Sequence, residues 1–140
     1  MPVLGYNIQG VSFEKNVKAV PPGQIEVKIS PTIKDLRLGE MTAPNGKVSG
    51  IDVLFDFEVE YRPDIAKASV RGSLLYIPQK REKIDEILSL WEDEKKIDPV
   101  LMVEVANFLT TELSPMLMII AKEMRVPYHV PLPRAELRGQ

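Results

Sequence analysis

The sequence predicts an α+β protein, in which a four-stranded antiparallel sheet is followed by two or three helices packed on one of its faces. Two observations support this class. Apolar and polar residues alternate through the first half of the chain, in strands between about residues 3 and 77. From about residue 80 to residue 125 the apolar spacing becomes helical. The length of 140 residues fits one domain with a core, so we expect a single domain over residues 1–140.

The clearest strand is the segment GIDVLFDFEVEY, which ends at Tyr61. Its odd positions are apolar from Ile51 onward, and its even positions include Asp52, Asp56, Glu58 and Glu60. A period of two over this length predicts a strand with one buried and one solvated face. The turn residues RPD follow, and IAKASVRGSLLYI then alternates again. These two segments should therefore form an antiparallel hairpin.

Two earlier strands are indicated by alternation that changes phase. In QIEVKIS the apolar residues share one face, and Pro31 then shifts the pattern. A proline inside a strand predicts an edge strand or a bulge. LGYNIQGVSF shifts phase as well, and we expect a bulge at Gly10.

The helical part begins with KREKIDEILSLWEDEKK, whose apolar residues include Ile84 and Trp91. Asp98 followed by Pro99 is typical of a helix start, and that helix should run to about Leu113. Ser114 and Pro115 repeat the signal, so either a third helix begins there or one long helix kinks. The proline-rich tail, residues 126–140, is expected to be extended.

Residues 116–121, MLMIIA, are apolar on every side of a helix, whereas a surface helix needs only one apolar stripe. A sheet can cover one side only, and leaving the rest in water would forfeit on the order of 10 kcal/mol. We therefore expect a second copy of the chain, in a homodimer or homotetramer, or a captured apolar polypeptide to cover it. The predicted peptide-binding or oligomer-interface residues are Trp91, Met102, Phe108, Met116, Met118, Ile119 and Met124. Methionine is common on adaptable binding surfaces, and plain core and oligomer packing is the alternative for these residues.

No arrangement of residues in the sequence is typical of a catalyst. The single histidine, His129, lies between prolines without a recognisable catalytic motif, and packing in the tail is the expected role. The acidic face of Asp52 and Asp56 could hold a divalent cation, but Lys67 and Arg71 on the next strand favour a solvated, charge-paired face. We expect no enzymatic activity, no metal and no cofactor.

Composition indicates a cytoplasmic protein. The net charge of −2 gives no basic excess for nucleic-acid binding. Cysteine is absent, which suits a reducing compartment, and the first residues, MPVLGYNIQG, do not resemble a signal peptide. The most apolar window, Val100 to Ala121, contains Glu104 and Glu112, so we expect no membrane span.

Three segments resemble the protein-export chaperone SecB family. YNIQGVSFEKN is similar to that family's first strand with its SFE triplet, and GSLLYI is similar to the end of its fourth strand. LSPMLMIIAKEMRVPYHVPLP resembles its last helix, which begins at a proline and precedes an extended tail. The resemblance runs from Leu4 to Pro133 and has few identities outside SFE.

The resemblance implies a homotetramer, built as a dimer of dimers, that holds unfolded preproteins in apolar grooves. It also implies docking to a motor ATPase through acidic residues on the sheet, and some relatives serve toxin–antitoxin pairs. Glu14 matches one docking acid, but Gly10 stands where an aspartate is expected, and Lys67 lies near another acidic position.

The first functional hypothesis is therefore a non-enzymatic, cytoplasmic, SecB-like oligomer that binds unfolded or apolar polypeptide. The second is a structural or adaptor oligomer that keeps the fold without chaperone activity. A metal-dependent enzyme that uses the acidic strand face ranks third.

Overall fold

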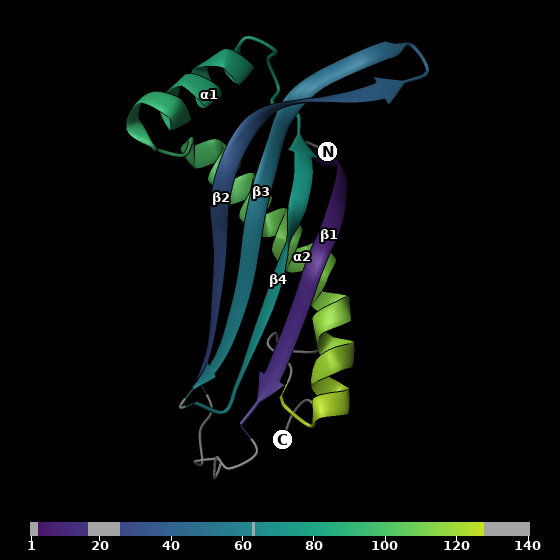
Figure 1. The fold of residues 1–140 in the computed structure, drawn as a ribbon, viewed down its shortest axis with the longest axis vertical. Coiled ribbons are helices and arrows are strands. Elements are labelled where there is room, and N and C mark those ends of the chain that lie inside the picture. Colours follow the sequence, from purple (N-terminus) through teal and green to yellow (C-terminus); the bar gives the residue numbers. More distant parts are fainter. Residues whose placement is uncertain (1–2, 17–25, 63, 128–140) are drawn as a thin grey trace, which may run out of the picture.

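The computed structural model describes residues 3–16, 26–62 and 64–127, and confirms the α+β class with a four-stranded antiparallel sheet (Figure 1). The described elements are β1 (Val3–Lys15), β2 (Glu26–Ala43), β3 (Gly46–Arg62), β4 (Ala66–Tyr76), α1 (Lys83–Glu94) and α2 (Pro99–Met124). His129 and most of the predicted extended tail lie outside the described residues.

The strand order β1-β4-β3-β2 is that of a Greek key, in which three successive strands pair as hairpins and β1 lies beside β4. The predicted hairpin between β3 and β4 is confirmed, with Tyr61 opposite Ala66 and Ile51 opposite Tyr76. Within the described residues, β1 and β2 are the edges of this sheet. The long β2–β3 hairpin continues beyond the other strands (Figure 1).

The two predicted strand irregularities have different outcomes. The pairing of β1 with β4 shifts between Ile8 and Gly10, as the phase change predicts. Strand β2 is an edge strand, but its pairing with β3 shifts between Ile33 and Asp35, while Pro31 stays opposite Phe57. An edge strand can accept proline without a bulge, because a missing N–H on its open side leaves no partner unsatisfied.

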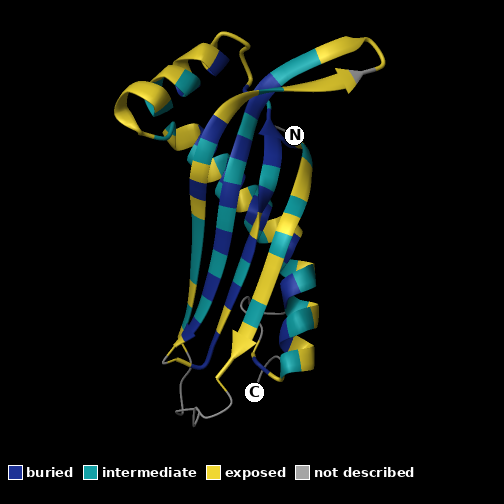
Figure 2. Cartoon of the chain, viewed as in Figure 1, coloured by how far each residue is buried: buried dark blue, intermediate teal, exposed yellow. Residues whose placement is uncertain are grey.

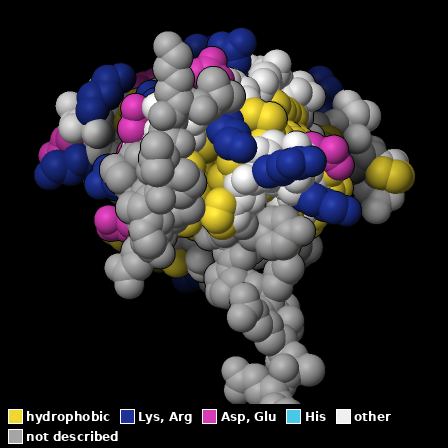
Figure 3. Space-filling model, turned by 90° about the horizontal axis from the view of Figure 1, so that it is seen from below, with side chains coloured by type: hydrophobic (Ala, Val, Ile, Leu, Met, Phe, Trp, Pro, Cys, Tyr) yellow, Lys and Arg dark blue, Asp and Glu magenta, His cyan; other side chains and the backbone are white. Residues whose placement is uncertain are grey.

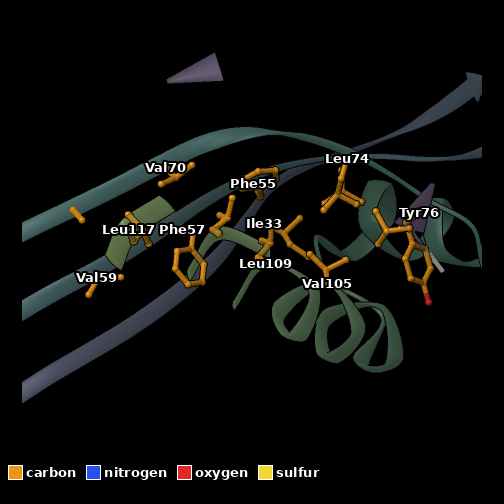
Figure 4. Close-up of a cluster of buried hydrophobic side chains, with 14 of the residues drawn as sticks. Ile33, Phe55, Phe57, Val59, Val70, Leu74, Tyr76, Val105, Leu109 and Leu117 are labelled. Atoms are coloured by element: carbon orange, nitrogen blue, oxygen red, sulfur yellow. The ribbon is translucent and has the colours of Figure 1, made fainter. Parts of the chain in front are cut away.

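The core forms where α2 crosses one face of the sheet. The odd positions of β3 from Ile51 to Tyr61 are buried, and so are the even positions of β4 from Ala66 to Tyr76. The buried residues of α2 recur every four positions, at Leu101, Val105, Leu109, Leu113, Leu117 and Ala121. Figure 4 shows side chains of the helix among those of the strands, and burying each large one stabilises the fold by about 1.5–3 kcal/mol.

Residues 99–124 form one helix, so the third helix that Ser114 and Pro115 could have started is not formed. The predicted cap is confirmed, because the Asp98 carboxylate accepts a hydrogen bond from the Leu101 N–H at 3.1 Å. Pro115 lies inside the helix, where it cannot donate to the preceding turn, and α2 changes direction along its course (Figure 1). The Ser114 hydroxyl donates to the carbonyl of Thr110 just before the proline.

The packing of β1 on β4 depends on Gly72, and this dependence gives a test of the sheet. A Cβ at this position would overlap the backbone carbonyl of Asn7 on β1. We expect Gly72→Ala to lower the free energy of unfolding by about 1–3 kcal/mol, because backbone cannot yield as a flexible side chain can.

The matched control is Gly5→Ala, whose Cβ would meet only the terminal methyl of Met41, at 3.4 Å. We expect this change to alter stability by less than about 0.5 kcal/mol. Urea denaturation of the three proteins gives the comparison, and equal stabilities for the two variants would contradict the β1–β4 register.

Candidate functional site

From Val100 to Ile119, the surface of α2 opposite its buried stripe is uncharged, and the exposed Lys122 and Glu123 follow it. We define the outer face of α2 as the exposed residues Val100, Val103, Asn107, Thr111, Pro115 and Ile119. Three of them are large aliphatic side chains with high exposure, at 55% for Val100, 59% for Val103 and 65% for Ile119. A helix face of this kind is unusual toward water, where charged residues normally stand.

The two glutamates in the middle of α2 are held toward the sheet by tyrosines. The Tyr76 hydroxyl donates to Glu104 at 3.2 Å, and the Tyr6 hydroxyl donates to Glu112 at 3.1 Å. Burial, together with the Glu104 charge, raises the pKa of Tyr76 to about 12, and the hydrogen bond to Glu112 raises the pKa of Tyr6. Both tyrosines therefore stay protonated donors at neutral pH, and the glutamates border the outer face without interrupting it.

The predicted interface residues of α2 do not all lie on one surface. Met102, Phe108, Met116 and Met124 are partly buried and pack against the chain's own core. The Phe108 ring meets Tyr6 edge-on, with 5.6 Å between ring centroids. Met118 is half-buried, and Ile119 belongs to the exposed outer face.

Trp91 connects α1 to the edge strand β2 by a hydrogen bond. Its indole N–H donates to a carboxylate oxygen of Asp35 at 3.0 Å, and the Lys95 ammonium lies 5.0 Å from the ring centroid. The guanidinium of Arg37 donates to the same carboxylate at 2.7 Å. The hydrogen bonds from Arg37, from Trp91 and from the Leu36 backbone together lower the pKa of Asp35.

Further apolar surface lies on β1, where sequence reasoning did not place a site. Leu4 is 49% exposed, Tyr6 41% and Val11 43%. Tyr6 and Val11 are opposite the buried Leu74 and Val70, so they extend the apolar face of the sheet toward its edge. Figure 2 shows the edge strand β1 as exposed or intermediate along most of its length. The alternation of apolar and polar residues changes phase in this strand. That change is the one feature of the sequence that indicates an irregular edge strand.

The other face of the sheet carries charges of both signs in register. Glu60 lies between Lys28 and Lys67 on the neighbouring strands, and Asp56 is opposite Arg71 and accepts a hydrogen bond from Ser69 at 2.9 Å. The described residues contain no group of three side chains suited to hold a metal ion.

Glu14, the predicted docking residue, is exposed and lies opposite Lys67. Lys67 lies between Glu14 and Glu60, so this part of the sheet does not form a purely acidic patch. The docking role of Glu14 stays a prediction.

Apolar side chains are also exposed at one end of the molecule, where the β3–β4 turn and the C-terminal end of α2 lie. In Figure 3, which views this end, hydrophobic side chains lie among Lys, Arg, Asp and Glu side chains. Met124, at the end of α2, packs against the core, and Val126, two residues further on, is part of it.

Comparison of the chain with models of known protein families, with curated proteins and with solved structures found no match. The resemblance to the SecB family therefore stays a prediction from the sequence. Among the described residues, α2 is the one helix that is long and apolar enough to cross a membrane, and 28% of its most apolar window is buried.

Because Trp91 is the chain's only tryptophan, its fluorescence reports on the contact between α1 and β2. The pKa of Asp35 is lower in the folded chain than in the unfolded chain, so its carboxylate stabilises the fold above the unfolded-state pKa. This contribution is lost as the pH falls through the folded-state pKa. We expect Trp91 emission to be constant from neutral pH down to about pH 4 and to change below it.

Asp35→Asn should remove this acid transition and lower stability at neutral pH by up to about 1 kcal/mol, as for other solvent-accessible charge pairs. Asp85→Asn, on an exposed part of α1, is the control and should keep the transition. An unchanged fluorescence titration in Asp35→Asn would show that Asp35 does not hold Trp91.

Proposed function

We propose that this protein is a non-enzymatic homo-oligomer of SecB-like fold that binds unfolded or apolar segments of other polypeptides. The observation that carries the proposal is the uncharged outer face of α2, which stays exposed although the opposite stripe of the helix already completes the core. The sequence resemblance to the SecB family supports the same reading. The absence of cysteine favours the cytoplasm as its setting.

Covering the outer face is energetically favourable. Full burial of an aliphatic side chain contributes about 1.5–3 kcal/mol, so covering Val100, Val103 and Ile119 stabilises a complex by several kcal/mol. The neighbouring Asn107 and Thr111 are small and uncharged, and their burial does not carry the desolvation cost of an ion.

A second copy of the chain is one occupant of this surface. An uncharged face meets its own copy without like-charge repulsion, as a two-fold interface requires. Strand β1 adds an edge that is paired only on its β4 side among the described residues, and it carries the exposed side chains of Leu4, Tyr6 and Val11. An open apolar edge of this kind is a site for pairing with another strand.

An extended apolar segment of a client polypeptide is the other occupant. The methionines beside the outer face, Met116 and Met118, are half-buried and flexible, so they can adapt to clients of different sequence. The buried stripe and the Tyr6–Glu112 and Tyr76–Glu104 hydrogen bonds commit the rest of α2 to the sheet, which favours a protein over a lipid bilayer as the binding partner.

A structural or adaptor oligomer is the second candidate function. Its specific support is that Met102, Phe108, Met116 and Met124 already pack against the chain's own core. In that case self-association covers the whole outer face, and no surface remains for a client.

The double variant Val103→Asp with Ile119→Asp tests the proposal. Both residues are exposed in the single chain, so the variant should fold, whereas two aspartates at an apolar interface should weaken self-association and client binding at least about a hundredfold. The measurements are sedimentation velocity and the suppression of aggregation of a chemically unfolded substrate protein.

Leu38→Asp, at a side chain 62% exposed on the β2–β3 hairpin, is the matched control and should behave as the wild type. A wild-type oligomer that suppresses no aggregation supports the adaptor reading. A double variant that keeps both oligomer and suppression would contradict any role of the outer face.

A further inference from the structure

A partly enclosed cavity lies where the β2–β3 hairpin passes the segment that joins β4 to α1. Its volume is about 330 Å³, within the range of small-molecule sites. The lining residues are Lys47, Val48 and Ser49 of β3, Ile77, Pro78, Gln79 and Arg81 of the joining segment, and Ile84 of α1. The cavity is separate in sequence and in lining from the outer face of α2.

Close backbone approach at a glycine shapes this cavity. Gly39 and Gly50 are opposite each other on β2 and β3, at the root of the projecting hairpin (Figure 1). A Cβ on Gly50 would lie 2.6 Å from the Cδ1 of Ile77 and 2.7 Å from the carbonyl oxygen of Tyr76. The backbone of β3 therefore lies close to the end of β4 and the start of the joining segment, so the two walls of the cavity lie next to each other.

The charges that line the cavity are all positive. Lys47 and Arg81 are its ionisable residues, and no carboxylate is among the lining side chains. Lys47 has a loose pair with Glu40 at 3.9 Å, and Arg81 forms no ion pair with any residue in the described ranges. Lys80 and Lys83 flank Arg81 in the sequence, but Glu82, Asp85 and Glu86 offset their charge, so the positive charge at the cavity is that of Lys47 and Arg81 themselves.

The remaining walls are partly apolar and partly polar. Val48, Ile77, Pro78 and Ile84 supply hydrocarbon surface, and Pro78 and Ile84 are buried and therefore fixed in place. Ser49 and Gln79 add a hydroxyl and an amide. This combination matches a molecule with one anionic end and a short apolar body.

We propose that this cavity binds a small organic carboxylate whose charged end meets Arg81 and Lys47 and whose apolar body lies against Ile77 and Ile84. A guanidinium is suited to this end because it can donate two parallel hydrogen bonds to one carboxylate. The site goes beyond the proposed function and does not depend on it, since it uses no residue of the outer face of α2.

Titration with octanoate, followed by calorimetry and by amide chemical shifts, tests the proposal. Saturable binding is expected, with shifts concentrated at Lys47, Ser49, Gln79 and Ile84. The uncharged analogue 1-octanol has the same apolar body and should bind much more weakly. Equal binding of octanol and octanoate would overturn the assignment of the charged end.

Arg81→Gln should weaken octanoate binding by about tenfold or more, because the charge-assisted hydrogen bonds of the guanidinium are lost, and Lys47→Gln should weaken it in the same direction. Both side chains are exposed, so neither change should disturb folding. Arg62→Gln, which removes the same charge at the far end of β3, is the matched control and should bind octanoate as the wild type does. Shifts at Val103 and Ile119, or equal weakening in Arg62→Gln, would place the binding elsewhere and overturn the proposal.

Discussion

The interaction on which the rest of this structure depends is the packing of one stripe of α2 against the apolar face of β3 and β4. The stripe recurs every four residues from Leu101 to Ala121, and it meets side chains such as Phe55 and Phe57 that alternate along β3. A helix of 26 residues is about 39 Å long, so α2 follows the sheet for much of its length. A single helix is nevertheless narrow, and Tyr6 and Val11 at the β1 edge stay partly uncovered.

The same packing determines which surface is left for function. Because Tyr76 and Tyr6 hold Glu104 and Glu112 beside the sheet, the side of α2 that faces away from it carries no charge between Val100 and Ile119. Because α2 is covered by the sheet on one side, we propose that another copy of the chain or a bound polypeptide covers its other side. The binding properties that we propose thus follow from how the chain folds its own core.

Most of the fold can be predicted from the sequence, but little of the candidate site can. Alternation predicts β3 and β4 because a half-buried strand must place apolar residues at every second position, and Asp98 predicts the start of α2 because its carboxylate caps the free N–H groups. In contrast, a helix that is apolar all round does not reveal which side will meet the sheet, so Met102 and Phe108 could not be separated from Ile119. The hydrogen bond between Trp91 and Asp35 joins residues that are 56 positions apart, and no local sequence pattern predicts it. The cavity beside Gly50 likewise depends on where two distant segments cross.

The most direct test of the central claim measures mass and free apolar surface in the same sample. Light scattering gives the mass of the particle, and an apolar fluorescent dye reports surface that self-association has not covered. We expect an oligomer that still binds the dye, because the outer face of α2 and the edge at β1 are two apolar surfaces on different elements, and a contact through one of them leaves the other exposed. A monomer that binds no dye would contradict the account, since Val100, Val103 and Ile119 would then be covered by neither a partner nor the dye.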